Sequence, residues 1–104
     1  MSNVTNIILI IEPYAEDKIE PLNEYIRQFS LPELKQVDSL ASGDKNMECA
    51  VYCAAYNHFT YEGLVDIFNK IEWDSSRTIL IVIPDLCEER PIIIRMGKES
   101  NATL

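Results

Sequence analysis

Two uninterrupted aliphatic runs, Ile7–Ile11 and Ile79–Ile83, constrain the fold of this chain more than any other feature of its sequence. β-branched residues fill most positions of both runs, and Pro13 and Pro84 follow closely, so each run is expected to be a short strand that ends there. Because polar residues do not alternate with apolar ones, both faces of these strands should be apolar, which is typical of strands inside a sheet. Each run has only five residues, far from the ~18 that a membrane-spanning helix needs.

Two other segments have the apolar spacing of amphipathic helices. Residues 17–29 form one such stripe, with Asp17 as the expected N-cap and Glu20 completing a capping box. Residues 61–71 form a second helix, for which Thr60 is the expected N-cap. Trp73 follows that helix and is expected to close its end over the core.

Three weaker segments complete the pattern of strands. Residues 34–41 mix apolar and polar side chains, as expected of a strand at the edge of a sheet. Residues 47–56 are compatible with a strand or a helix; a strand is favoured because the turn-forming residues 42–46 precede them. Residues 91–96 resemble a last short strand, and residues 97–104 are expected to be a flexible polar tail.

The resulting order, β-α-β-β-α-β-β, predicts an α+β class and a single domain spanning residues 1–104. Its first six elements match the ferredoxin-like arrangement, a two-layer sandwich, here with an added C-terminal strand. With strands numbered along the chain, this topology predicts the sheet order 5-4-1-3-2. That order places the apolar strands inside and the polar second strand at an edge, so polarity and topology agree. Phe68 and Ile81 are expected to be core residues.

The same topology leaves one face of the sheet without a helical layer. Two helices cover only one face, yet Ile7–Ile11, Ile79–Ile83 and Ile92–Ile94 are apolar on both faces. Large exposed apolar patches mark interaction sites. The sequence therefore predicts that this face either forms a homodimer or docks another protein.

The charge of the chain narrows the choice of partner. Nine Lys and Arg stand against 17 Asp and Glu, a net charge of −8, which argues against nucleic acid and against an anionic membrane surface. No signal peptide is evident, and three cysteines, Cys49, Cys53 and Cys87, make a poor disulfide framework. A cytoplasmic location is therefore expected.

The sequence contains no motif that indicates a particular reaction. The three cysteines and His58, the only histidine, have the composition of a zinc site. On a strand, however, Cys49 and Cys53 would lie roughly 13 Å apart, too far to share one ion. Buried thiols that pack as small apolar groups are the favoured interpretation. No catalytic residue, metal or cofactor is expected, and the protein is interpreted as a non-enzyme.

Two acidic clusters are candidates for binding a protein partner. The first lies in the connection after the strand 79–83 and combines carboxylates with an apolar residue: Asp85, Leu86, Glu88 and Glu89. Loops held by rigid strands commonly carry recognition residues, so this cluster is preferred. The second lies at the start of the first helix, where the helix dipole already favours carboxylates: Glu12, Glu16, Asp17 and Glu20.

Residues 49–59, CAVYCAAYNHF, are followed by the helix 61–71, by Trp73 and by the strand pair 78–96. This layout, with Tyr56-Asn57 and Trp73, resembles that of small bacterial toxin-immunity proteins. The resemblance implies an acidic cytoplasmic inhibitor that binds and neutralises a toxin domain, most simply a basic one. The alternative is a small homodimeric α/β binding or regulatory module that uses its open sheet face.

Overall fold

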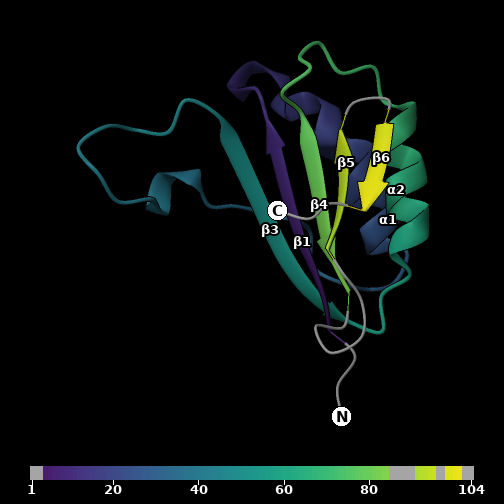
Figure 1. Ribbon diagram of the computed structural model, residues 1–104. Helices are drawn as coiled ribbons and strands as arrows, with labels where there is room; N and C mark the ends of the chain where they lie inside the picture. Colours follow the sequence, from purple (N-terminus) through teal and green to yellow (C-terminus); the bar gives the residue numbers. More distant parts are fainter. Residues whose placement is uncertain (1–3, 85–90, 96–97, 102–104) are drawn as a thin grey trace.

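The protein is an α+β fold built on one six-stranded sheet, seen in a computed structural model that describes residues 4–84, 91–95 and, for the backbone, 98–101. The sheet order is β2-β3-β1-β4-β5-β6, and every neighbouring pair is antiparallel (Figure 1). The strands are β1 (Val4–Ile11), β2 (Lys35–Gln36), β3 (Ala50–Asn57), β4 (Ile79–Ile83), β5 (Ile92–Arg95) and β6 (Lys98–Asn101).

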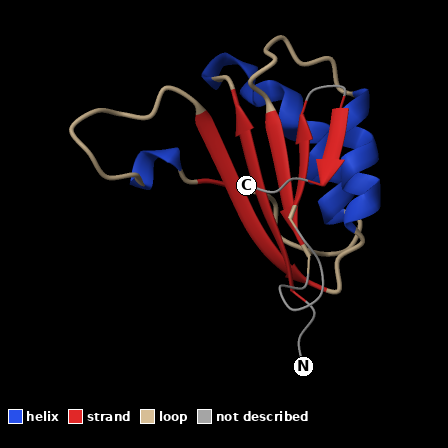
Figure 2. Ribbon diagram, in the orientation of Figure 1, coloured by secondary structure: helices blue, strands red, loops and turns tan. Residues whose placement is uncertain are grey.

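Both α-helices lie on the same face of this sheet and form a second layer (Figure 2). α1 spans Glu20–Arg27 and packs beside α2, which spans Tyr61–Lys70. Two 3-10 helices accompany them, η1 (Pro13–Ile19) before α1 and η2 (Asp38–Leu40) after β2. None of the described helices is both long and apolar enough to cross a membrane.

The hydrophobic core lies between the sheet and the helices. In β1 and β4, and over most of β3, residues alternate between buried side chains, which face the helices, and half-buried ones, which face away. In β5, residues 92–94 are all buried. Phe68 of α2 is 0% exposed, so its expected core position is confirmed. The prediction for Ile81 is wrong: it is half-buried and faces away from the helices, because its neighbours Leu80 and Val82 take the core side of β4.

The end of α2 is closed as expected. Trp73 is buried and its ring packs against Phe68 with centroids 5.3 Å apart. Its indole Nε1 donates a hydrogen bond of 3.0 Å to the carbonyl of Phe68. The same carbonyl also accepts the backbone N–H of Ile71 at 3.3 Å, so both bonds close the last turn of the helix.

The helix starts differ from expectation. α1 begins at Glu20 with Ile19 at its N-cap, and neither this cap nor Thr60 at α2 makes a side-chain capping hydrogen bond. The capping box predicted from Asp17 and Glu20 is therefore wrong. Pro21 has no N–H to bond to the carbonyl of Asp17, which disfavours an α-helix that starts at Asp17. Residues Pro13–Ile19 form a 3-10 helix there.

The expected strand 34–41 is also mostly wrong, because pairing ends after Gln36. Beyond Gln36, two hydrogen bonds to Val51 of β3 replace the regular strand pairing. The Val51 carbonyl accepts the backbone N–H of Val37 at 2.8 Å, and the Val51 N–H donates to Oδ1 of the Asp38 carboxylate at 3.0 Å. A side chain thus replaces the backbone as partner of β3, and the backbone turns into η2. The same hydrogen bond lowers the pKa of Asp38.

Two further segments, residues 47–56 and the chain from residue 97 onward, can be compared with their predicted structure. Most of residues 47–56 belong to the strand β3, Ala50–Asn57, so the favoured strand assignment is confirmed over the helix. The expected tail from residue 97 onward is instead partly a strand, because β6 pairs with β5 along Lys98–Asn101.

Candidate functional site

The most conspicuous surface feature is the sheet face that carries no described helix, here called the open face. It consists of the outward-facing residues of the three central strands, which occupy alternate positions in each strand. These residues are Asn6, Ile8, Ile10, Val51, Cys53, Ala55, Ile79, Ile81 and Ile83.

Strand register aligns these side chains in rows across the sheet. Ile8 of β1 lies opposite Cys53 of β3 on one side and opposite Ile81 of β4 on the other. The next row joins Val51, Ile10 and Ile79 in the same way. Cross-strand neighbours of this kind touch, so the aliphatic side chains form one continuous apolar surface and not isolated residues.

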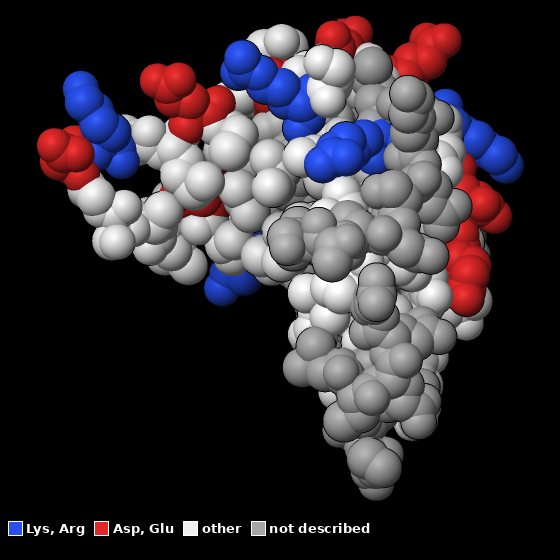
Figure 3. Space-filling view, viewed as in Figure 1, with Lys and Arg blue, Asp and Glu red and all other residues white. Residues whose placement is uncertain are grey.

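Charged residues lie around this surface and not in its centre. Figure 3 views the open face; where described residues are visible, the coloured Lys, Arg, Asp and Glu side chains lie mainly at its margin. Lys35 of β2 and Arg95 of β5 are exposed cations beside it, and Glu48 is an exposed carboxylate before β3. An apolar centre within a charged margin is the usual anatomy of a protein interface.

A groove of about 640 Å³ crosses the part of the open face near β2. Its described lining consists of Asn6, Ile7, Ile8, Lys35, Val37, Cys53, Ala54, Ala55 and Ile83. Two small outward-facing residues of β3, Cys53 and Ala55, explain the hollow. They are too short to fill the space between Val37 on one side and Ile83 on the other.

Polar groups are few in this groove. Lys35 is the only charged residue of its described lining. Within the described chain, neither the Lys35 ammonium group nor the Asn6 amide has a side-chain hydrogen bond or ion pair, although other surface cations, such as Lys18 and Arg27, are paired. The groove therefore offers an apolar floor and two unpaired polar groups.

Cys49, Cys53 and His58 are the described residues of the cysteine and histidine set that the sequence offered. Burial raises the pKa of the Cys53 thiol, which keeps it protonated and a poor nucleophile. His58 is exposed and takes a left-handed backbone conformation, with φ 53°, immediately after β3. Within residues 4–84, 91–95 and 98–101, no three His, Cys, Asp or Glu side chains come close enough to hold a metal ion. Cys87 lies outside the described residues.

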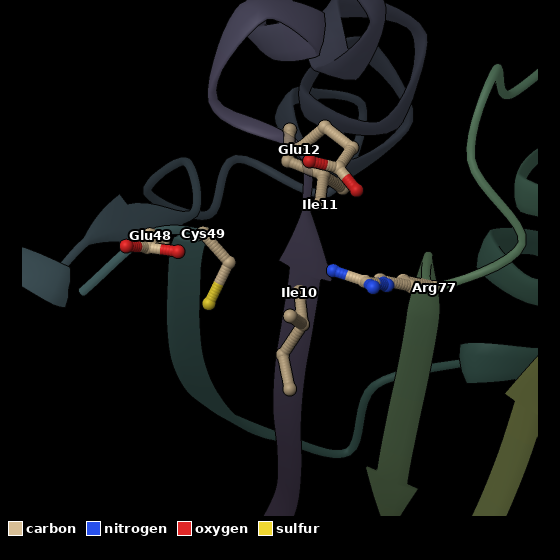
Figure 4. Close-up of a pocket in the computed structure, with 6 residues that line it drawn as sticks. All are labelled: Ile10, Ile11, Glu12, Glu48, Cys49 and Arg77. Atoms are coloured by element: carbon tan, nitrogen blue, oxygen red, sulfur yellow. The ribbon is translucent and has the colours of Figure 1, made fainter.

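A second, smaller pocket of about 250 Å³ lies at one end of the sheet. Figure 4 shows Arg77 extending from the start of β4 toward the end of β1, with Glu48 and Cys49 on the other side of β1. Ser75 connects two residues that line this pocket, Glu12 and Arg77. Its Oγ donates a hydrogen bond to the Glu12 carboxylate at 2.8 Å and accepts one from the backbone N–H of Arg77 at 3.1 Å. One oxygen of the Glu12 carboxylate is thus tied to the loop before β4.

The two acidic clusters predicted to bind a partner differ in whether the structure describes them. The preferred cluster, Asp85, Leu86, Glu88 and Glu89, lies outside the described residues. In the second cluster, Glu12 accepts the hydrogen bond from Ser75, Glu16 accepts one from the Gln36 amide at 2.9 Å, and Glu20 is paired with Arg27. Three of its four carboxylates thus have side-chain partners within the chain, and Asp17 has none among the described contacts.

Sequence reasoning missed the residues that shape the groove, among them Lys35, Val37 and Ala55. The one local signal was the succession of small residues Cys53-Ala54-Ala55 in a strand otherwise rich in large side chains. Comparisons of the chain with protein-family models, with curated proteins and with solved structures found no match.

Proposed function

We propose that this protein is a non-enzymatic binding protein and that a protein partner docks on its open face. The observation that carries the proposal is the continuous apolar surface of Ile8, Ile10, Val51, Ile79 and Ile81, which no described helix covers. Apolar surface that stays in water is unfavourable by about 25 cal/mol per Å². A partner that covers these rows removes this cost, which makes the face the strongest candidate for binding energy in the described chain.

The net charge supports a basic partner. A charge of −8 produces a negative field that speeds the approach of a positively charged protein. Exposed carboxylates on the helical layer, such as Glu24, Glu62 and Asp66, contribute to this field. An inhibitor that neutralises a basic toxin domain by covering it is the role we propose on these grounds. We also propose a ferredoxin-like fold, supported by the β-α-β-β-α-β order of the first six main elements, with β5 and β6 added beside β4.

A homodimer is the second candidate, because two copies could cover each other's open face without any other partner. The margin of this face favours such pairing, since it carries both signs of charge, with Lys35 and Arg95 as well as Glu48. Oppositely charged side chains of two copies can then face one another.

The experiment compares two variants that each add one negative charge. Ile81→Glu changes the centre of the open face, whereas Asn69→Glu changes an exposed position of α2. The tagged chain is used to capture partners from the native lysate, and its own mass in solution is measured by sedimentation. Val51→Glu serves as a second open-face variant if Ile81→Glu does not fold.

Capture of one basic protein by the parent chain and by Asn69→Glu, but not by Ile81→Glu, supports the inhibitor. A dimer that only Ile81→Glu dissociates supports the homodimer. If the parent chain is monomeric and both variants capture the same proteins equally, the open face is not the binding surface. In that case the two acidic clusters are compared. The double variant Glu88→Lys plus Glu89→Lys tests the cluster in the connection after β4, and charge reversal of Glu16 and Glu20 tests the cluster before and at the start of α1.

A further inference from the structure

We propose that the open-face groove binds a small amphipathic carboxylate, a free monomer with an apolar chain and one anionic end. This inference goes beyond the proposed function, because it concerns a small molecule and requires no protein partner. It rests on the volume of the groove, the chemistry of its lining and the position of Lys35.

The dimensions fit a small ligand. Small-molecule sites are concave, have volumes of roughly 300–1,000 Å³ and are lined mainly by apolar side chains with a few polar groups. The groove is shallow and open to solvent along one side; it has about 640 Å³, and seven of its nine described lining residues are apolar or a thiol. Among them, Ile8, Cys53 and Ile83 come from three adjacent strands, so this floor is held in place by the sheet.

Electrostatics select the sign of the ligand. Lys35 is the only charged residue in the described lining, and no described carboxylate pairs with it. Its ammonium group is therefore available to a ligand anion, and the Asn6 amide offers a further donor. Carboxylates with a short apolar chain combine both requirements, since the chain can cover Ile8 and Ala55 while the anionic end reaches Lys35.

The backbone around Lys35 is firmly placed for this role. β2 pairs Lys35 with Cys53 and Gln36 with Tyr52, and the next residue, Val37, donates its N–H to the Val51 carbonyl at 2.8 Å. Lys35 and Val37 therefore form a fixed lip of the groove. Such placement lowers the entropy lost on binding, because on the protein's side only the lysine side chain must become ordered.

The test uses decanoate, kept below the concentration at which it forms micelles, and follows the backbone amide signals of the isolated chain by NMR. We expect saturable shifts concentrated at the groove, around Val37, Cys53 and Ala55. Decyltrimethylammonium, which has the same chain length and the opposite charge, is expected to produce no saturable shifts there.

Two substitutions define the site, and one controls for charge. Lys35→Glu should weaken decanoate binding roughly ten- to hundredfold, the range for loss of a hydrogen bond to a charged group. Ala55→Trp should abolish binding, because this exposed position of β3 can accept a large side chain that fills the groove. Lys45→Glu makes the same charge change in an exposed loop outside the groove and should alter the affinity less than about twofold.

The proposal is overturned if decanoate gives no saturable shifts at the groove, if the cationic amphiphile binds equally well, or if Lys35→Glu and Lys45→Glu have the same effect. Should Ala55→Trp fail to fold, Cys53→Phe fills the same space from the neighbouring outward position. Because decanoate binding is measured on the isolated chain, its failure leaves the protein-docking proposal intact. A failed search for a protein partner likewise leaves decanoate binding intact.

Discussion

The phenol ring of Tyr25 lies directly over Gly63, so α1 and α2 approach each other at a point where α2 has no side chain. A Cβ atom at position 63 would overlap the ring and hydroxyl of Tyr25. The hydroxyl is held in place, since it donates a 2.7 Å hydrogen bond to the carbonyl of Thr60, immediately before α2. The ring also packs edge-on against Phe29 and Phe59, with centroids 5.1 and 5.9 Å away.

We predict that Gly63→Ala lowers the free energy of unfolding by about 1–3 kcal/mol, the usual cost of overpacking. Normally, glycine to alanine within a helix stabilises by about 0.5–1 kcal/mol, so the expected sign is the reverse of the helix-propensity effect. Denaturant unfolding of the two proteins measures the difference.

The control for this prediction removes the ring. In a Tyr25→Ala background, Gly63→Ala no longer creates an overlap and should stabilise the protein by about 0.5–1 kcal/mol relative to Tyr25→Ala alone. Equal effects of Gly63→Ala in both backgrounds would contradict the contact between Tyr25 and Gly63.

Stability should fall at high pH because of Tyr56. Burial, with a smaller contribution from Glu33, raises the pKa of this phenol from 10.0 to about 12, and its hydroxyl donates to the carbonyl of Pro32. Between these values the unfolded chain loses the proton first, so the stabilisation is complete below pH 10 and is lost as the pH rises toward 12. The loss should reach up to about 2 kcal/mol, measured by denaturant unfolding at several pH values.

Tyr56→Phe provides the matched control for the pH effect. It removes the titrating group and leaves the ring, at a cost of about 1 kcal/mol for the lost hydrogen bond. Its stability should therefore depend less on pH above 10 than that of the parent. Identical pH profiles for the two proteins would show that another group is responsible.

Phe68 and Ile81 should differ in their contribution to stability. Phe68→Ala removes a 0% exposed side chain from the core and should cost about 3–5 kcal/mol. Ile81→Ala removes a half-buried side chain from the open face and should cost about 1–2 kcal/mol in the monomer. Both values come from denaturant unfolding, and equal costs would mean that the open face is covered as fully as the core.

Ser30→Gly should stabilise the protein. Ser30 follows α1 with φ 59°, a left-handed conformation that glycine adopts without steric cost. Removing the left-handed strain of serine should stabilise the folded protein by about 1–2 kcal/mol. This gain exceeds the loss of stability of about 0.4–1 kcal/mol that results from the greater entropy of glycine in the unfolded chain. A net gain of about 0.5–1 kcal/mol is expected in thermal unfolding.

Ser42→Gly is the control for this prediction. Ser42 lies in an exposed loop and does not have a positive φ. Glycine there adds only unfolded-state entropy, so the variant should be slightly less stable than the parent. A gain at Ser42 equal to that at Ser30 would contradict the strain argument.

Elements with strong local patterns could be predicted from the sequence. The runs Ile7–Ile11 and Ile79–Ile83 lie within β1 and β4, and the periodic segment after Thr60 forms α2. β-branched side chains and helical spacing act within one segment, so no knowledge of distant contacts was needed. Segments with mixed patterns, such as residues 34–41, were predicted less well because a contact from Asp38 to Val51 ended the strand.

The sequence by itself determined that this chain has more aliphatic strand than two helices can cover, and hence that one sheet face is left without a helical layer. Only the tertiary structure decided which residues face which way, since each run is apolar at every position and its register is set by the partner strands. That is why Ile81 lies on the open face while Leu80 and Val82 lie in the core. The groove is likewise a tertiary feature, because its lip at Lys35 and its floor at Ala55 belong to different strands that meet only in the folded protein.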